Sequence, residues 1–114
     1  MNKSTEKKFG FFGSMPVSDA KSFLAQRAGL LSVDEKPSVL NYLRSGRKII
    51  LIAGPARDLL DENMPLIGSG HVFTDGIWQW TEDVLFFIEN YDVAPPNDFL
   101  ESMRSSNWRI QDFC

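Results

Sequence analysis

The 114-residue sequence contains one cysteine and one histidine, and both scarcities exclude common kinds of site. Cys114 has no second cysteine with which to form an internal disulfide, which is typical of a reducing, cytoplasmic location. One Cys and one His, far apart in the chain, do not supply the ligands of a closed tetrahedral zinc site. We therefore expect neither a bound metal nor another cofactor.

Long apolar runs and phosphate-binding loops are also missing. The longest apolar run, residues 49–53, is far too short to span a membrane. Residues 1–8 lack the apolar centre of a secretory signal, and we expect them to be disordered. The glycines within residues 9–13 are not followed by the Lys-Ser/Thr of a phosphate loop. The aromatic residues of this segment predict either a short edge strand or a packed arm.

The composition is that of one globular domain, but its charge is unevenly distributed. Apolar residues make up 43% of the chain and charged residues 24%, so residues 1–114 can form a single core. Residues 1–57 hold ten Lys/Arg against four acids, a net charge of +6. Residues 58–114 hold two Arg against eleven acids, a net charge of −9. This asymmetry indicates either an acidic surface for a basic partner or a dipolar, solvated exterior.

The most informative stretch is residues 74–83, which predicts a hairpin and the start of a helix. Asp75-Gly76 between alternating apolar residues is a strong signal for a two-residue type I′ turn. In that register Phe73 lies opposite Trp78 and His71 opposite Trp80. Because side chains alternate along a strand, these four residues share one face, which we expect to face the core.

A helix is predicted directly after this hairpin. Thr81 is its expected N-cap, with Glu82 and Asp83 at the positive end of the helix dipole. Apolar residues then recur at helical spacing over a wide arc, so this helix is covered on more than one side. We expect the hairpin and helix to give the core Phe73, Trp78, Trp80, Phe87 and Tyr91.

The rest of the chain adds helices and one strand. Helices are predicted at residues 18–30, from Lys36 to Gly46, and from residue 96 or 97 onward, the last with Phe99, Leu100 and Met103 inward. Residues 49–53 predict a strand buried on both faces, and residues 57–62 predict a helical turn. The apolar residues Trp108, Ile110 and Phe113 predict a C-terminal tail that packs back against the rest of the domain. The order lacks βαβ alternation and predicts an α+β fold, with a small, mainly antiparallel sheet and a central Asp-Gly hairpin covered by about four helices.

Catalytic interpretations find little support in the sequence. His71 could pair with Asp75 or Glu82, but a histidine at the rim of the core is the simpler interpretation. Asp75 already has a role in the turn, and Glu82 and Asp83 have roles at the helix start. The serines lack a Gly-x-Ser-x-Gly frame. We therefore expect the protein not to be an enzyme.

A nucleic-acid site is also disfavoured. Base-stacking aromatic residues would have to come from the half of the chain with net charge −9, whereas phosphate contacts need Lys or Arg nearby. A basic cluster is formed by Arg44, Arg47 and Lys48. Because these residues lie at a helix–strand junction, we interpret them first as cations that interact with the negative C-terminal end of the helix dipole, and only second as a nucleic-acid patch.

Residues 74–83 read Thr-Asp-Gly-x-Trp-x-Trp-x-x-Asp, followed by Tyr91 and a Pro-x-x-Phe-Leu segment at residues 96–100. This pattern resembles small stand-alone bacterial proteins with a Thr-Asp-Gly-x-Trp-x-Trp-Pro-x-Asp-Leu signature. That group includes immunity proteins of polymorphic-toxin and contact-dependent growth inhibition systems. In this chain Thr81 occupies the position at which the signature most often has Pro, and Val84 occupies the position at which it most often has Leu.

The likeness spans residues 49–108 and implies a protein that binds and neutralises a cognate toxin C-terminal domain, often a basic nuclease. Such a protein needs an acidic surface and no active site. We expect that surface to consist of Asp58, Asp61, Glu62, Asp75, Glu82, Asp83 and Glu89. Two alternatives stay open, a regulatory or adaptor domain and a small hydrolase that uses His71 with a carboxylate.

Overall fold

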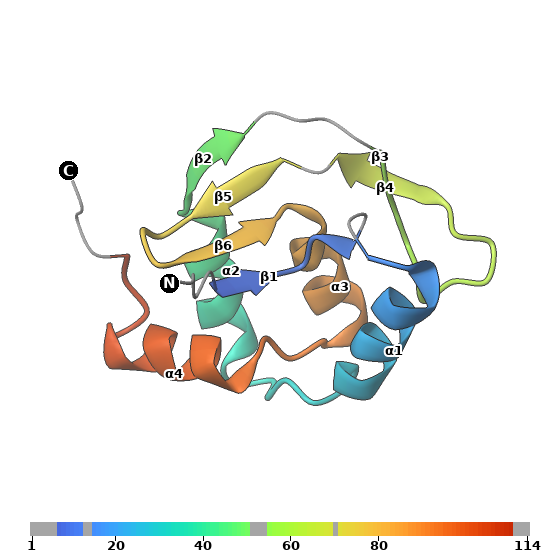
Figure 1. Cartoon of the computed structure of the whole chain (residues 1–114). Helices are drawn as coiled ribbons and strands as arrows, with labels where there is room; N and C mark the ends of the chain where they lie inside the picture. Colours follow the sequence, from blue (N-terminus) through green and yellow to red (C-terminus); the bar gives the residue numbers. More distant parts are fainter. Residues whose placement is uncertain (1–6, 13–14, 51–54, 70, 111–114) are drawn as a thin grey trace, which may run out of the picture.

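The computed structural model describes residues 7–12, 15–50, 55–69 and 71–110, which form an α+β fold (Figure 1). The helices are α1 (Val17–Arg27), α2 (Lys36–Arg44), α3 (Asp83–Tyr91) and α4 (Asn97–Ser105). The strands are β1 (Lys7–Phe9), β2 (Arg47–Ile50), β3 (Pro55–Arg57), β4 (Leu66–Ser69), β5 (Val72–Thr74) and β6 (Trp78–Thr81). The predicted fold class is confirmed. None of the described helices combines the length and apolar character needed to span a bilayer.

The main sheet has the strand order β1-β6-β5-β2. β5 pairs antiparallel with both β6 and β2, whereas β1 runs parallel to β6 at one edge. β3 and β4 form a separate antiparallel pair. The segment at residues 9–12 therefore begins in an edge strand, one of the two predicted forms. That strand includes Lys7 and Lys8, so the expectation of disorder over residues 1–8 is wrong for these two residues, and residues 1–6 lie outside the described part.

The hairpin forms as predicted, but its register is shifted by two residues. Phe73 lies opposite Trp80 and Thr74 opposite Gln79, so the loop is wider than the predicted two-residue turn. The cause is the Asp75 carboxylate, which accepts hydrogen bonds from the backbone N–H groups of residues 77 and 78 at 2.9 and 2.7 Å. Because side chains alternate with a period of two, a register shift of two residues leaves each side chain on the same face of the sheet. Trp78 and Trp80 are therefore buried, as expected.

The core is built around the ring of Phe99 on α4. It stacks on Trp78 with 4.4 Å between centroids and lies 5.5 Å from Trp80. Its edge contacts reach Phe9 at 6.3 Å and Tyr42 at 6.2 Å, so β1, β6, α2 and α4 meet at one side chain. Of the five predicted core residues, Trp78, Trp80 and Phe87 are buried, while Phe73 and Tyr91 are half-buried.

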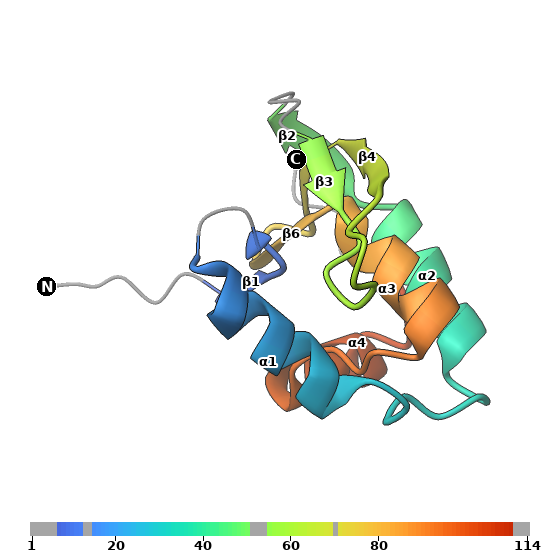
Figure 2. The same ribbon diagram turned by 90° about the vertical axis from the view of Figure 1, so that its right-hand side faces the viewer.

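α3 is the central helix that the sequence predicts, with Val84, Phe87 and Ile88 buried. Its start differs from the expectation, because Thr81 ends β6 and does not cap the helix. The Thr81 hydroxyl instead donates to the carboxylate of Asp83 at 2.6 Å. Figure 2 shows α3 beside α2, with the loop between β3 and β4 on its other side.

Three other sequence expectations need correction. The strand predicted at residues 49–53 is an edge strand, so Ile49 is 43% exposed instead of buried, and residues 51–53 lie outside the described part. Of residues 57–62, Arg57 belongs to β3 and pairs with β4, and residues 58–61 form a single turn, in which the N–H of Asp61 donates to the carbonyl of Asp58 at 3.3 Å, but no helix. α1 ends at Arg27 and not near residue 30. Trp108 and Ile110 pack against the core as predicted, while Phe113 lies outside the described residues.

Candidate functional site

Residues 58–65 connect β3 to β4, and we call them the tip loop (right side of Figure 1). The N–H of Asp58 donates to the carbonyl of Pro65 at 3.0 Å and closes the loop. Inside it, Asp61 accepts from the N–H of Asn63 at its carboxylate (2.8 Å) and from the N–H of Met64 at its carbonyl (2.9 Å). The tip loop is therefore held by its own hydrogen bonds in one conformation.

Asp58 fastens the tip loop to α3. Its side chain is only 4% exposed and accepts from the N–H of Leu60 at 3.0 Å and from the hydroxyl of Tyr91 at 2.7 Å. The hydrogen bond to this carboxylate raises the pKa of Tyr91 to about 12, with burial and then the negative charges of Asp58 and Asp61 adding to the shift. Tyr91 is the last residue of α3, so the loop is fixed to the C-terminal end of that helix.

The other acids of the tip loop are less buried than Asp58. Asp61 is half-buried and Glu62 is exposed. Leu66, which follows the loop on β4, is 60% exposed. The tip loop thus presents two carboxylates and an adjacent apolar side chain on a rigid frame.

Asp75 is the second predicted surface acid that the structure buries. It is 6% exposed and accepts a hydrogen bond from the hydroxyl of Tyr42 in addition to the two backbone donors of the hairpin loop. Burial, followed by the hydrogen bond and charge of Asp75, raises the pKa of Tyr42 above its usual value. Asp58 and Asp75 are therefore supports of the fold and are not exposed acids.

The other five predicted acids lie near both ends of α3 and do not form one patch. Glu82 and Asp83 stand at its N-terminus, where burial raises the pKa of Asp83. The tip loop is fixed at its other end, about 12 Å away for a helix of nine residues. Near that end, Glu89 is exposed and forms a salt bridge with Arg44 of α2.

The His71 imidazole makes no pair with a carboxylate through Nδ1 in the described part of the chain. Its Nδ1 atom is buried and has no hydrogen-bond partner among the described residues. Asp75, one proposed partner, is occupied by Tyr42 and the hairpin loop. Glu82 contacts the histidine through the backbone, its N–H donating to the His71 carbonyl at 2.9 Å. Within the described part of the chain, no three His, Cys, Asp or Glu side chains are grouped so that they could hold a metal ion.

The sequence did not predict that the hydroxyls of Tyr42 and Tyr91 donate to buried carboxylates, nor the role of Lys36. The Lys36 ammonium donates to the carbonyl of Glu89 at 3.0 Å and to the carboxylate of Asp92 at 2.7 Å. It thereby supplies a cation to the negative end of α3. Its place beside Pro37 at a helix start carried no signal of that contact, whose partners lie more than fifty residues away.

Comparisons of the chain with protein-family models, with curated proteins and with solved structures found no match. The resemblance to immunity proteins stays a prediction from the pattern of residues 74–83, Tyr91 and residues 96–100.

Proposed function

We propose that this chain is a non-catalytic immunity protein that binds and neutralises a cognate toxin domain through its acidic surface. The contact residues in this proposal are Asp61 and Glu62 of the tip loop together with Glu82, Asp83 and Glu89 of the α3 region. The observation that carries the proposal is the tip loop itself, an acidic loop already held in one conformation by hydrogen bonds to its own backbone and to α3.

Rigidity and charge would act together in such a contact. A loop that is ordered before binding loses little conformational freedom in the complex, so more of its contact energy appears as affinity. An exposed carboxylate such as that of Glu62 attracts a basic partner, for example a nuclease domain, and increases the rate of association. The buried carboxylates of Asp58 and Asp75 contribute indirectly, since they hold the tip loop and the hairpin loop in place.

The test is co-expression of the full chain with the toxin domain encoded beside its gene, with growth protection and binding affinity as readouts. Glu62→Lys should weaken binding about tenfold or more, equivalent to about 1.4 kcal/mol. Glu101→Lys is the matched control, because Glu101 is an exposed glutamate on α4, at the opposite end of the molecule in Figure 1. Equal behaviour of the two variants, or no binding to the neighbouring toxin domain, would refute the proposed surface.

His71→Gln separates neutralisation by binding from neutralisation by chemistry. Glutamine cannot replace an imidazole as a general base near neutral pH. If protection persists in this variant while binding is unchanged, a hydrolase that uses His71 is excluded. If protection is lost while binding persists, the non-catalytic proposal is wrong.

A further inference from the structure

The sequence contains one Asp-Gly dipeptide, Asp75-Gly76, and no Asn-Gly dipeptide. Asp-Gly is chemically labile in water, because the small glycine lets its backbone nitrogen reach the side-chain carboxyl carbon of the aspartate. The Gly76 nitrogen then bonds to Cγ of Asp75, and one carboxyl oxygen leaves as water with the amide proton and a proton from solvent. The resulting succinimide ring is opened by water at the original backbone carbonyl carbon, so that the chain continues through Cγ as isoaspartate.

The hairpin loop depends on both residues of this labile pair. Gly76 has φ +98°, a left-handed conformation that favours glycine. The Asp75 carboxylate holds the loop by accepting from the N–H groups of residues 77 and 78 at 2.9 and 2.7 Å. Replacing either residue would cost the loop its conformation or its charged acceptor. The stability of the hairpin and the lability of its Asp-Gly bond therefore have the same origin.

Both reacting groups are occupied in the folded chain. One carboxylate oxygen of Asp75 accepts the two backbone N–H groups of the loop, and the other accepts the hydroxyl of Tyr42 from α2. The Gly76 N–H donates to the Thr74 hydroxyl oxygen at 3.0 Å, and this hydroxyl donates to the carbonyl of Trp78 at 2.7 Å. Ring closure requires the carboxyl group to turn toward the nitrogen and the nitrogen to lose its proton. The reaction must therefore break these hydrogen bonds.

We propose that Asp75-Gly76 is a site of spontaneous isomerisation, and that the Tyr42 and Thr74 hydroxyls restrict the reaction to the times when the hairpin loop opens. An isomerised chain does not regain the native loop, because its backbone is one carbon longer and its carboxylate is attached directly to Cα. Tyr42 and the two backbone N–H groups then lose their acceptor. Isoaspartate at this position thus records how long the loop has been open. The inference does not depend on the proposed immunity function.

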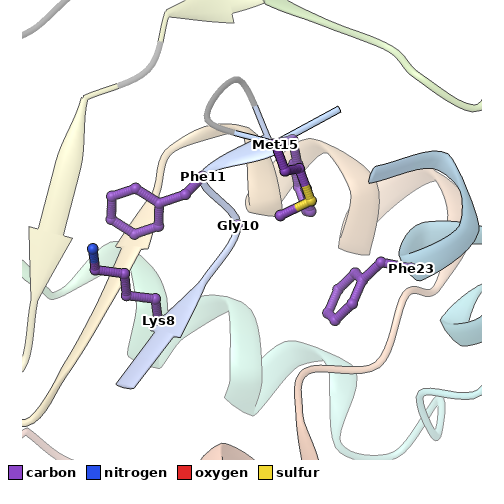
Figure 3. A pocket seen from close by; sticks show the side chains of 6 residues that line it. Lys8, Gly10, Phe11, Met15 and Phe23 are labelled. Atoms are coloured by element: carbon purple, nitrogen blue, oxygen red, sulfur yellow. The ribbon is translucent and has the colours of Figure 1, made fainter. Parts of the chain in front are cut away.

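The opening concerns the loop end of the hairpin and not the whole fold. At the other end of β6, the Thr81 hydroxyl accepts from the N–H of Phe11 at 3.0 Å, and β1 pairs alongside β6. Figure 3 shows Phe11 beside an apolar pocket of about 280 Å³, whose lining includes Met15 and Phe23. In Figure 1 this region and the hairpin loop lie at opposite ends of β6. Local openings of this kind need less free energy than unfolding of the whole chain.

The test measures isoaspartate in the full chain during incubation at neutral pH. Isoaspartate methyltransferase with a labelled methyl donor counts the modified residues, and chromatography of proteolytic fragments assigns them to Asp75. A synthetic peptide of residues 72–80 gives the rate without the fold. The folded chain should react at least about a hundredfold more slowly than the peptide, since opening breaks several hydrogen bonds to a charged group.

Four variants separate local from global opening. Tyr42→Phe should accelerate the reaction about tenfold, because one hydrogen bond that must break is already absent. Thr74→Val frees the Gly76 N–H and should also accelerate it, which gives a second test if Tyr42→Phe does not fold. Tyr91→Phe is the matched control, since it removes the tyrosine-to-aspartate hydrogen bond of the tip loop. Met15→Ala is a control in the pocket, and both controls should change the rate less than about twofold.

Three outcomes would overturn the inference. The first is a folded chain that isomerises within about threefold of the peptide rate. The second is isoaspartate that accumulates at another residue and not at Asp75. The third is equal acceleration by Tyr42→Phe and by the two controls when their free energies of unfolding in urea are equally lowered. That result would show that unfolding of the whole chain, and not the two hydroxyls, controls the reaction.

Discussion

Replacing Tyr42 with phenylalanine would test whether one buried hydrogen bond ties α2 to the hairpin. The phenylalanine ring keeps the contacts of the tyrosine ring with Trp80 and Phe99, whose centroids lie 6.3 and 6.2 Å away. Only the hydroxyl is lost, and with it the hydrogen bond to the Asp75 carboxylate, which is 6% exposed. Water therefore has little access to replace the missing donor.

The expected cost is that of a hydrogen bond to a charged, buried group, about 1.5–3 kcal/mol. Since the stability of a domain is about 5–15 kcal/mol, this is a large fraction of the total. For a chain of this length, 1 kcal/mol changes Tm by about 3–6 °C, so a loss of 2 kcal/mol should lower it by about 6–12 °C. Urea unfolding at neutral pH measures the free energy directly.

A double-mutant cycle with Asp75→Asn separates this bond from other effects of each substitution. The coupling energy between the two positions should be about 1–3 kcal/mol if the hydroxyl and carboxylate stabilise each other. Asp75→Asn alone should be the more destabilising single change, because it also weakens the acceptor for two backbone N–H groups. A Tyr42→Phe cost below about 0.5 kcal/mol, or a coupling energy near zero, would refute the reasoning.

Two further predictions concern alkaline pH and close packing. The pKa of Tyr42 is raised by burial and by Asp75, so above about pH 10 the unfolded chain releases this proton while the folded chain keeps it. Stability should fall as pH rises above 10, by up to about 1.4 kcal/mol per pH unit from this group, and Tyr42→Phe should flatten the slope in urea titrations. Gly46→Ala should cost about 3 kcal/mol, because its Cβ would lie 2.4 Å from a ring carbon of the fully buried Trp80. Gly29→Ala, at φ +78° in open space, should cost only about 1 kcal/mol, and the reverse order in thermal unfolding would contradict this packing argument.

Features fixed by local chemistry could be predicted from the sequence. Lys36-Pro37 does begin α2, because proline suits the first helical turn. The apolar spacing of Phe99, Leu100 and Met103 does give the buried face of α4. The burial of Trp78 and Trp80 was also predictable, since a strand alternates its side chains whatever its exact register.

Features that depend on distant partners could not be predicted. Asp58 and Asp75 look like surface acids in the sequence, yet each accepts a hydrogen bond from a tyrosine 33 residues away. The pair β3–β4 was missed because strands of three and four residues are too short to show an alternating pattern. The hairpin register was wrong by two residues because the turn signal of Asp-Gly takes no account of what the Asp75 carboxylate binds.

The parallel pairing of β1 with β6 has a consequence for how the chain is made. A ribosome adds about 5–20 residues per second, and about 70 residues separate Lys7 from its partner Trp78. The first strand therefore waits about 4–14 s for the strand that it joins, and longer for Phe99, on which Phe9 packs. The helices α1 and α2 can form during that time, but the sheet edge cannot close. Native structure is thus completed only late in biosynthesis, and the aromatic N-terminal segment depends on the nascent chain avoiding other contacts until then.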